Sequence, residues 1–504
     1  MACAFFDLHF LRYCIACFLF CMMLTQEVHA QAITDKAGSA ILEADSLSNE
    51  KRRALIIGRI VIVGNDVTRE AIIRRELPFT EGSSVQVADI PALLEKARIN
   101  VSNTQLFLEV TTSIIGATVQ TIDLEIAVKE RWYILPIPQF KLVDRNFNQW
   151  WKEQHRSMER VNYGVKLFWN NTTGRSDKLR LFYLNGYSRQ FLLEYEMPFF
   201  DRKMEKGFGF SAGYLQSRQM QYATDADKQV FYPVSNNEIG AFVRSTFRAQ
   251  GAFTIRKGVR HRHAFKLAYV ADQIPDTISR LIQSNSIKGF MPFFGAEDRR
   301  QRYLEAIYQY QYFAVDNIAY PLRGSNANIV FMQRGLGNAG LNLWQLNAQA
   351  SRFFLIGAQK KTSLALQGYG MLKLPFAQPY VNMNALGYGE WFLRGLEYYV
   401  IDGVMAAMLK TTLRHELFDL RLATVLTRSE KYNRVPFKVL FKVYGDVGAV
   451  HHPSAVTSVL SNRLLYTAGA GIDLLSYYDF VARFEYSINQ LGEKGLFLHL
   501  QKAF

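Results

Sequence analysis

The chain has 504 residues and a formal net charge of +15, from 59 lysines and arginines against 44 aspartates and glutamates. No dense run of Lys and Arg carries this charge, so the composition gives no support for nucleic-acid binding and fits contact with phosphate-bearing lipids. All four cysteines lie within the first 21 residues, which leaves the rest of the chain without a disulfide framework.

The first 54 residues are predicted to carry a targeting signal and a linker. An apolar run from Tyr13 to Leu24 is too short for a membrane span, and Ala30 is the kind of small residue that signal peptidases prefer. We therefore expect residues 1–30 to be a signal peptide that is cleaved after Ala30, and residues 31–54 to be a flexible linker. A lipoprotein signal stays open as the alternative, because Cys17 follows a small residue.

Residues 55–132 are predicted to form one small α+β domain with the element order β-α-α-β-β. A β-branched run ends at Gly64, where a turn signal begins. Apolar residues at helical spacing follow, and Asp89 is the expected cap of the second helix. Alternating apolar and polar residues then predict two closing strands. The expected elements are strands over residues 55–63, 105–112 and 122–128, a helix over 68–77, and a helix that contains residues 90–97.

Residues 133–504 show repeated short runs with a period of two. Phe437, Val439 and Phe441 alternate with Lys438 and Lys442, for example. About sixteen such runs are present, and none approaches the roughly 18 apolar residues of a membrane-spanning helix. A soluble β-sandwich alternates in the same way, but it does not need an apolar face on nearly every strand. The pattern predicts a transmembrane β-barrel of about 16 antiparallel strands, with lipid outside and water inside.

Short motifs in both parts resemble the BamA/TamA superfamily of outer-membrane assembly and two-partner secretion proteins. Residues 55–132 resemble its periplasmic POTRA module, and residues 133–504 resemble its C-terminal surface-antigen-type barrel. The chain departs from the family at Leu396, where an aromatic residue is usual, and in having one POTRA domain where several are common. The matching stretches are Ile62-Val63-Gly64-Asn65, Glu81-Gly82, Val128-Lys129-Glu130, Glu196-Met197-Pro198-Phe199-Phe200, Tyr320-Pro321-Leu322-Arg323-Gly324, Leu393-Arg394-Gly395-Leu396, Tyr444-Gly445-Asp446-Val447-Gly448 and the terminal Phe504.

The segment from Pro375 to Gly403 is the candidate functional loop. Its glycines and aromatic residues suit a loop that folds back on itself. The resemblance implies that the motif Leu393-Arg394-Gly395-Leu396 enters the barrel lumen and that Arg394 pairs with Asp446. Period-two counting places Glu416 on the same inward face, so we expect Glu416 to be a second acceptor for the arginine. A solvated arginine at the tip of an outer loop is the alternative.

No catalytic, metal-binding or nucleotide-binding motif stands out. His261 and His263 share one strand face, but no cysteine or nearby acidic residue accompanies them, so we expect no metal site. We therefore expect no enzyme activity and no cofactor. The resemblance instead implies a C-terminal assembly signal on the lipid face, formed by Leu496, Leu498, Leu500 and Phe504.

The resemblance implies a protein of the bacterial outer membrane, with its POTRA domain in the periplasm, that inserts or translocates other proteins into or across that membrane. The implied partners are unfolded outer-membrane or secreted client proteins, periplasmic chaperones, lipoproteins, and outer-membrane lipid and lipopolysaccharide, with no nucleic acid. A weak seam between the first and last barrel strands is the implied site where client strands are templated. Two alternatives stay open, a two-partner-type secretion pore for a dedicated client and a passive or lipid-handling channel.

Overall fold

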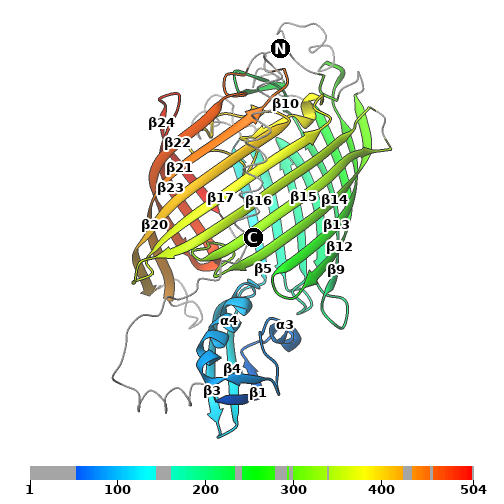
Figure 1. Cartoon of the computed structure of the whole chain (residues 1–504). Helices are drawn as coiled ribbons and strands as arrows, with labels where there is room; N and C mark the ends of the chain where they lie inside the picture. The colour runs from blue at the N-terminus through cyan, green and yellow to red at the C-terminus, as the bar shows by residue number, and fades with distance from the viewer. Residues whose placement is uncertain are drawn as a thin grey trace.

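The computed structural model describes residues 53–142, 161–232, 241–277, 292–294, 299–337, 340–423, 434–454 and 458–501. The expected signal peptide with its cleavage site at Ala30, nearly all of the expected linker, and Phe504 lie outside these residues. A small N-terminal domain and a large barrel make up the described chain (Figure 1). No helix in the described part is long and apolar enough to cross a membrane.

The N-terminal domain is a four-stranded sheet with two helices packed on it. Its strand order is β2-β1-β4-β3, with β1 parallel to β4. Alternate residues of β4, including Leu124 and Ile126, are buried against Ile73 and Ala97 of the helices, so the predicted period of two produces the core. The elements are β1 (Ala54–Val63), α3 (Glu70–Arg74), β2 (Ser84–Gln86), the 3-10 turn η1 (Val87–Asp89), α4 (Ile90–Ser102), β3 (Phe107–Ala117) and β4 (Thr121–Glu130).

The structure differs from the predicted elements of this domain at three points. Helix α3 spans five residues rather than 68–77. At its start, the Val67 and Thr68 N–H groups donate to the Glu130 carboxylate at 3.1 and 2.7 Å. After its end, the Glu76 and Leu77 N–H groups bond to carbonyls three residues back rather than four. Asp89 stands at the start of α4, but its side chain makes no capping hydrogen bond. Strand β2 is not predicted from the sequence, since its three residues are too few to show an alternation.

The barrel is a single sheet of 16 antiparallel strands, as the sequence predicts. Its strands follow one another in chain order, and two short hairpins, β10–β11 and β18–β19, stand apart from the sheet. The barrel strands are β5 (Ile134–Leu142), β6 (Val161–Asn170), β7 (Lys178–Gly186), β8 (Ser188–Met197), β9 (Lys206–Ser217), β12 (Arg244–Lys257), β13 (His261–Gln273), β14 (Arg300–Val315), β15 (Gly324–Leu336), β16 (Leu343–Ile356), β17 (Thr362–Leu374), β20 (Met405–Ala423), β21 (Arg434–His451), β22 (Leu464–Ser476), β23 (Phe480–Asn489) and β24 (Lys494–Gln501). The hairpins and turns are β10 (Met220–Asp225), β11 (Lys228–Tyr232), the 3-10 turn η5 (Tyr380–Asn382), β18 (Asn384–Leu386), β19 (Ile401–Asp402) and the 3-10 turn η6 (Tyr477–Asp479).

The strands alternate between an apolar outer face and a polar lumen. On β24, Leu496 and Leu498 point outward and are 73% and 57% exposed, while on β21 Lys442 and Asp446 point inward and are buried. Lipid can cover the first face and water the second, and the paired backbone satisfies its own polar groups. This alternation confirms the prediction of a transmembrane β-barrel.

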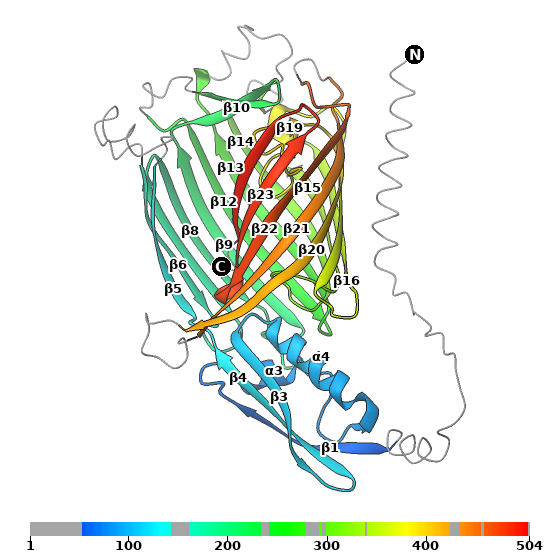
Figure 2. The ribbon, with the colours of Figure 1, turned by 90° about the vertical axis from the view of Figure 1, so that its left-hand side faces the viewer.

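The sheet has two free ends, β5 and β24. Within the described residues, β5 pairs only with β6 and β24 only with β23. Strand β5 contains Pro136 and Pro138, which have no N–H group to donate, and prolines are tolerated in edge strands for this reason. Figure 2 views the side of the barrel on which β5 and the red C-terminal strands face the reader. The first and last strands therefore leave a seam in the barrel wall.

The N-terminal domain lies across one end of the barrel, which we call the domain end, and the opposite end is the far end (Figures 1 and 2). Phe199, from the turn between β8 and β9, is part of the core of the N-terminal domain. Arg131 binds Asp479 at 2.8 Å, and Asn103 donates to the carbonyl of Val315 at 2.9 Å. The domain is thus docked on several barrel turns by both apolar and polar contacts.

Candidate functional site

The segment from Pro375 to Gly403, here called the lumen loop, connects β17 to β20 and folds back into the barrel. Leu393 and Leu396 are almost fully buried in it. Trp391 stacks on Tyr369 of β17 with ring centroids 4.0 Å apart. The aromatic residues therefore pack the loop against the inner wall, as its composition predicts.

Arg394 is held inside the barrel by contacts on every side of its guanidinium. Its Nε donates to Asp446 Oδ2 at 2.8 Å, Nη2 donates to the other carboxylate oxygen, and Nη1 donates to Thr412 Oγ1 at 3.0 Å. Its backbone N–H donates to the same Asp446 carboxylate at 3.1 Å, and its guanidinium lies 3.9 Å from the centre of the Tyr444 ring. Because Arg394 is 8% exposed and Asp446 is 1% exposed, each charge depends on the other for compensation.

Glu416, the expected second acceptor, does not contact Arg394. It points inward, but it binds Lys438 at 2.9 Å. Asp446 lies opposite Lys410 in the pairing of β20 with β21, and a six-residue separation places Glu416 about 20 Å farther along the strand. Glu485 on β23 is the second carboxylate near the arginine, with 3.9 Å between Nη1 and Oε1.

A second buried ion cluster lies beside this pair and is not predicted from the sequence. Lys442 binds both Asp473 and Glu485, the latter at 2.7 Å. Tyr320, from the turn between β14 and β15, donates its hydroxyl to Asp473 at 2.5 Å. The alternation along each strand identifies the side chains that face the lumen and could join such a cluster. The sequence does not reveal which of them lie at the same height in the barrel.

Glycines on β22 make room for this cluster. A Cβ atom built on Gly469 lies 2.4 Å from the Tyr444 hydroxyl, and one built on Gly471 lies 3.2 Å from Lys442 Cε. Both distances are shorter than ordinary van der Waals contact. The alternation of alanine and glycine in β22 therefore lets two long side chains of β21 lie across its inner face.

The lumen loop also contacts the last hairpin of the barrel. Asn489 donates to the carbonyl of Gly395 at 2.9 Å, and Tyr399 donates to Glu493 at 2.8 Å. Phe392 stacks on His499 of β24 with centroids 5.3 Å apart. The loop thus joins the wall around Asp446 to the strand that forms one side of the seam.

Three loops meet over the far end of the barrel. Asp227, at the turn of the β10–β11 hairpin, accepts hydrogen bonds from Ser458 Oγ and from the N–H groups of Val459 and Leu460 at 2.5, 2.7 and 2.8 Å. Its backbone carbonyl accepts from the Val400 N–H at 2.9 Å. We call this assembly the far-end cap.

Three residues of the expected C-terminal assembly signal lie on the outer surface. Leu496, Leu498 and Leu500 are exposed on the outer face of β24, while Phe504 is outside the described residues. His261 and His263 each share a hydrogen bond with a tyrosine hydroxyl at 2.9 Å. In the described part of the chain, no group of three or more His, Cys, Asp or Glu residues is placed to hold a metal ion.

Residues 55–131 match the family model described as POTRA, surface antigen variable number repeat. The N-terminal domain is a POTRA domain. A POTRA domain followed by one 16-stranded barrel confirms the predicted resemblance to the BamA/TamA superfamily. No curated protein matches the chain.

Solved structures resemble the chain over most of its length. BamA from Haemophilus ducreyi lacking POTRA domains 1–3 is 17% identical, with a TM-score of 0.47, and the match covers 89% of this chain and 84% of that one. CdiB from Escherichia coli is 14% identical, with a TM-score of 0.48 and coverage of 91% and 82%. CdiB from Acinetobacter baumannii is 13% identical, with a TM-score of 0.46 and coverage of 88% and 73%.

A bidentate ion pair between the POTRA domain and the barrel joins Glu76 to Arg256 of β12. Arg256 donates from both terminal nitrogens to the two carboxylate oxygens, each at 2.7 Å. Glu76 is 1% exposed, and Arg75 donates to it at 3.2 Å. A two-pronged pair of this kind fixes orientation as well as distance, so the POTRA domain is held in one pose on the barrel.

Proposed function

We propose that this chain lies in the bacterial outer membrane, with its POTRA domain in the periplasm, and inserts other proteins into that membrane. The observation that carries the proposal is the seam between β5 and β24, whose facing edges are unpaired among the described residues. Backbone N–H and C=O groups without partners are costly beside lipid. They are also a template on which an extended client strand can add.

Two features favour insertion at the seam over passage through the lumen. The far-end cap closes over one end of the barrel through the bonds to Asp227. The POTRA domain lies across the other end. A polypeptide moving straight through the lumen has to displace both, as well as the lumen loop. A secretion pore therefore has less support than an insertase.

The POTRA sheet offers a surface on which clients or periplasmic partners can bind. Strand β3 is the last strand of that sheet and has one strand neighbour, β4, in the described sheet. Ile114 and Ile115, on opposite faces of β3, are 47% and 49% exposed. An extended segment of a client, chaperone or lipoprotein can pair with such an edge through its backbone. Client capture at β3 and insertion at the seam are then successive steps on one molecule.

Depletion of the protein, followed by proteomics of the outer membrane and the medium, tests the proposal. We expect a broad fall of outer-membrane barrel proteins with little change in the medium. The loss of one secreted protein from the medium alone contradicts insertion and supports the secretion pore. No change in either fraction supports the passive channel.

A crosslinking experiment locates the client. A photo-reactive residue at Leu496, on β24, is compared with one at Phe331 in the middle of the sheet, since both side chains are exposed on the outer face. We expect crosslinks to nascent outer-membrane proteins from position 496 only. Equal crosslinking from both positions contradicts a role for the seam.

A further inference from the structure

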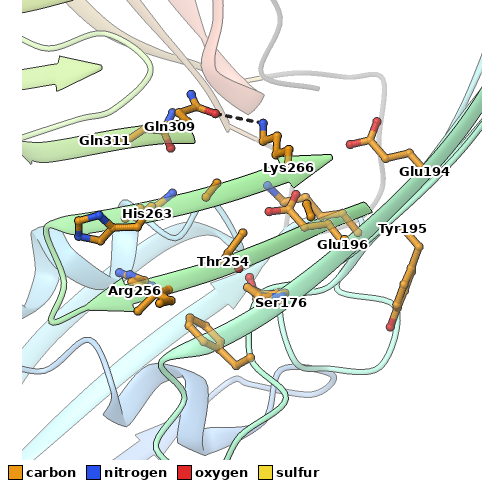
Figure 3. A pocket seen from close by; sticks show the side chains of 18 of the residues that line it. Ser176, Glu194, Tyr195, Glu196, Thr254, Arg256, His263, Lys266, Gln309 and Gln311 are labelled. Carbon is orange, nitrogen blue, oxygen red and sulfur yellow. Dashed lines mark hydrogen bonds between the residues drawn. The ribbon is translucent and has the colours of Figure 1, made fainter. Parts of the chain in front are cut away.

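Two cavities lie where the POTRA domain meets the barrel. One, of about 380 Å³, faces the inner wall of strands β7 to β9 and β12 to β14 (Figure 3). The other, of about 390 Å³, lies between one face of α4 and the turns that follow β12 and β14. We call the second one the α4 cavity. The side chains of Arg256 and Arg262 line both cavities, so these two arginines stand between them.

Positive charge is in excess at this point. Arg256 and Arg262 are directly opposite each other in the pairing of β12 with β13, and Arg75 approaches from the POTRA domain. Glu76 is the carboxylate between them, and it is bound by Arg256 and Arg75. Burial and the nearby charge of Arg256 lower the pKa of Arg75 from its usual value. The charge of Glu196 on β8 also acts on Arg262, so three arginines lie near two carboxylates.

Among the described residues, Arg262 forms no direct ion pair with a carboxylate, although the charges of Glu76 and Glu196 attract it. Its guanidinium lies over the ring of Phe313, 5.2 Å from the centroid. The Nε atoms of Arg256 and Arg262 are both buried and have no hydrogen-bond acceptor within the described part of the chain. Buried N–H groups are costly without an acceptor, so an anion bound next to these arginines would gain from donors that the protein leaves unused.

The α4 cavity extends the same charge toward the periphery. Lys96 of α4, Arg260 and Arg323 line it together with the two shared arginines. The two carboxylates in its lining already have donors. Glu95 binds Arg98 at 2.6 Å, and Asp316 Oδ1 accepts three backbone N–H groups of its own turn. The lining holds five cationic residues against these two carboxylates, so its formal charge is positive, as an anion site requires.

The outer surface beside this cavity carries an aromatic belt. His261 contacts the Tyr310 hydroxyl at 2.9 Å, and His263 contacts the Tyr308 hydroxyl at 2.9 Å. Such belts mark the level of lipid head groups on membrane barrels. Arg260 and Arg262 flank His261 in the chain, so the α4 cavity lies near the level of the head groups on the domain side.

We propose that the α4 cavity binds a phosphate group, supplied by an anionic lipid head group of the adjacent leaflet, between Arg262 of the barrel and Lys96 of the POTRA helix. The fork of an arginine matches two phosphate oxygens, and free phosphate shares this chemistry. A phosphate bound there joins the POTRA domain to the barrel through charge. The inference rests on the membrane location in the proposed function and is independent of client insertion.

Lipid binding to the purified full-length chain in detergent tests the site. Native mass spectrometry measures retention of phosphatidylglycerol against phosphatidylcholine for wild type, Arg262→Gln, Arg262→Lys and Arg323→Gln. We expect preferential retention of phosphatidylglycerol, weakened about tenfold in Arg262→Gln and less in the other two variants. Arg59→Gln is the matched control, because the Arg59 side chain is 82% exposed and distant in the POTRA sheet.

Competition with inorganic phosphate distinguishes the source of the ligand. Displacement of phosphatidylglycerol by phosphate supports one shared site. Phosphate binding that depends on Arg262, without lipid retention, supports the phosphate site with a soluble source. Wild-type retention in folded Arg262→Gln and Arg323→Gln overturns the proposal, and so does binding of an acidic peptide with no binding of phosphate or lipid. Exposed Arg323 keeps the test valid if the Arg262 variants fail to fold.

Discussion

Arg394 of the lumen loop and Asp446 of β21 are joined by three hydrogen bonds, two from the guanidinium and one from the Arg394 backbone N–H. We expect Arg394→Ala and Asp446→Ala each to loosen the lumen loop toward protease and to lower client insertion. Removing one partner leaves the other charge buried without compensation, a loss of about 3–5 kcal/mol in related cases. The backbone pairing of the 16 strands is unchanged, so the barrel itself should still fold and resist SDS until heated.

The double variant decides whether the pair acts as a unit. If it does, Arg394→Ala and Asp446→Ala together cost less than the sum of the two single variants, in both stability and insertion. Arg394→Lys should lose nearly as much stability and insertion as Arg394→Ala, since lysine cannot make a bidentate contact with the Asp446 carboxylate. Arg248→Ala is the control, because Arg248 binds Glu305 elsewhere in the lumen. Additive single effects exclude a coupled pair.

The Glu76–Arg256 pair should control how firmly the POTRA domain is docked. Removing one partner leaves a buried charge uncompensated, a loss of about 3–5 kcal/mol in related cases. We expect Glu76→Gln to speed hydrogen exchange in α3 and in the turn that holds Phe199. Glu70→Gln is the control, since the Glu70 side chain is 51% exposed in its pair with Arg74 and such pairs contribute about 0–1 kcal/mol. Equal exchange in both variants contradicts the docking role.

Asp227 should keep the far-end cap closed. Asp227→Ala removes the acceptor for one hydroxyl and two N–H groups of the opposite loop, and each group left without a partner costs about 1–3 kcal/mol. We expect more frequent or larger openings in planar-bilayer conductance recordings. Asp225→Ala, two residues away on the exposed end of β10, should leave conductance at the wild-type level. If both variants give identical recordings, Asp227 does not keep the far-end cap closed.

The sequence predicts the barrel well because its two environments, lipid and water, act on alternate residues of every strand. The pairing of Arg394 with Asp446 follows from motifs that the family resemblance supplies. Glu416 shows where this reasoning fails. The sequence shows which residues of a strand face the lumen, but their height in the barrel depends on strand register. The register places Lys410, and not Glu416, opposite Asp446.

The docking of the POTRA domain on the barrel is not predicted from the sequence, for a different reason. Glu76 and Arg256 are 180 residues apart, and neither belongs to a recognisable motif. A glutamate near the end of a predicted helix normally indicates a solvated surface. Whether the barrel buries it depends on the shapes of the barrel and of the POTRA domain. Contacts between separately folded parts therefore need the structure.

Gly469 and Gly471 should be required for the order of the lumen cluster. A Cβ atom at position 469 meets the Tyr444 hydroxyl and the carbonyl of Tyr486 at 2.4 Å each, and one at 471 meets the carbonyl of Phe484 at 2.3 Å. Two of these three neighbours are backbone atoms, which cannot rotate away. Overpacking of this kind costs about 1–3 kcal/mol.

We therefore expect Gly469→Ala to displace the Tyr444 ring from the Arg394 guanidinium and to expose the lumen loop to protease. Gly471→Ala should instead disturb Lys442 and its carboxylates. Gly251→Ala in β12 is the matched control, because a Cβ atom there meets nothing within 4 Å. Heat-modifiability on SDS gels reports the fold, and protease mapping reports the loop. If Gly469→Ala and Gly471→Ala match Gly251→Ala in both measurements, the inner wall can accommodate the added methyl groups. The two glycines are then not required to position Tyr444 and Lys442.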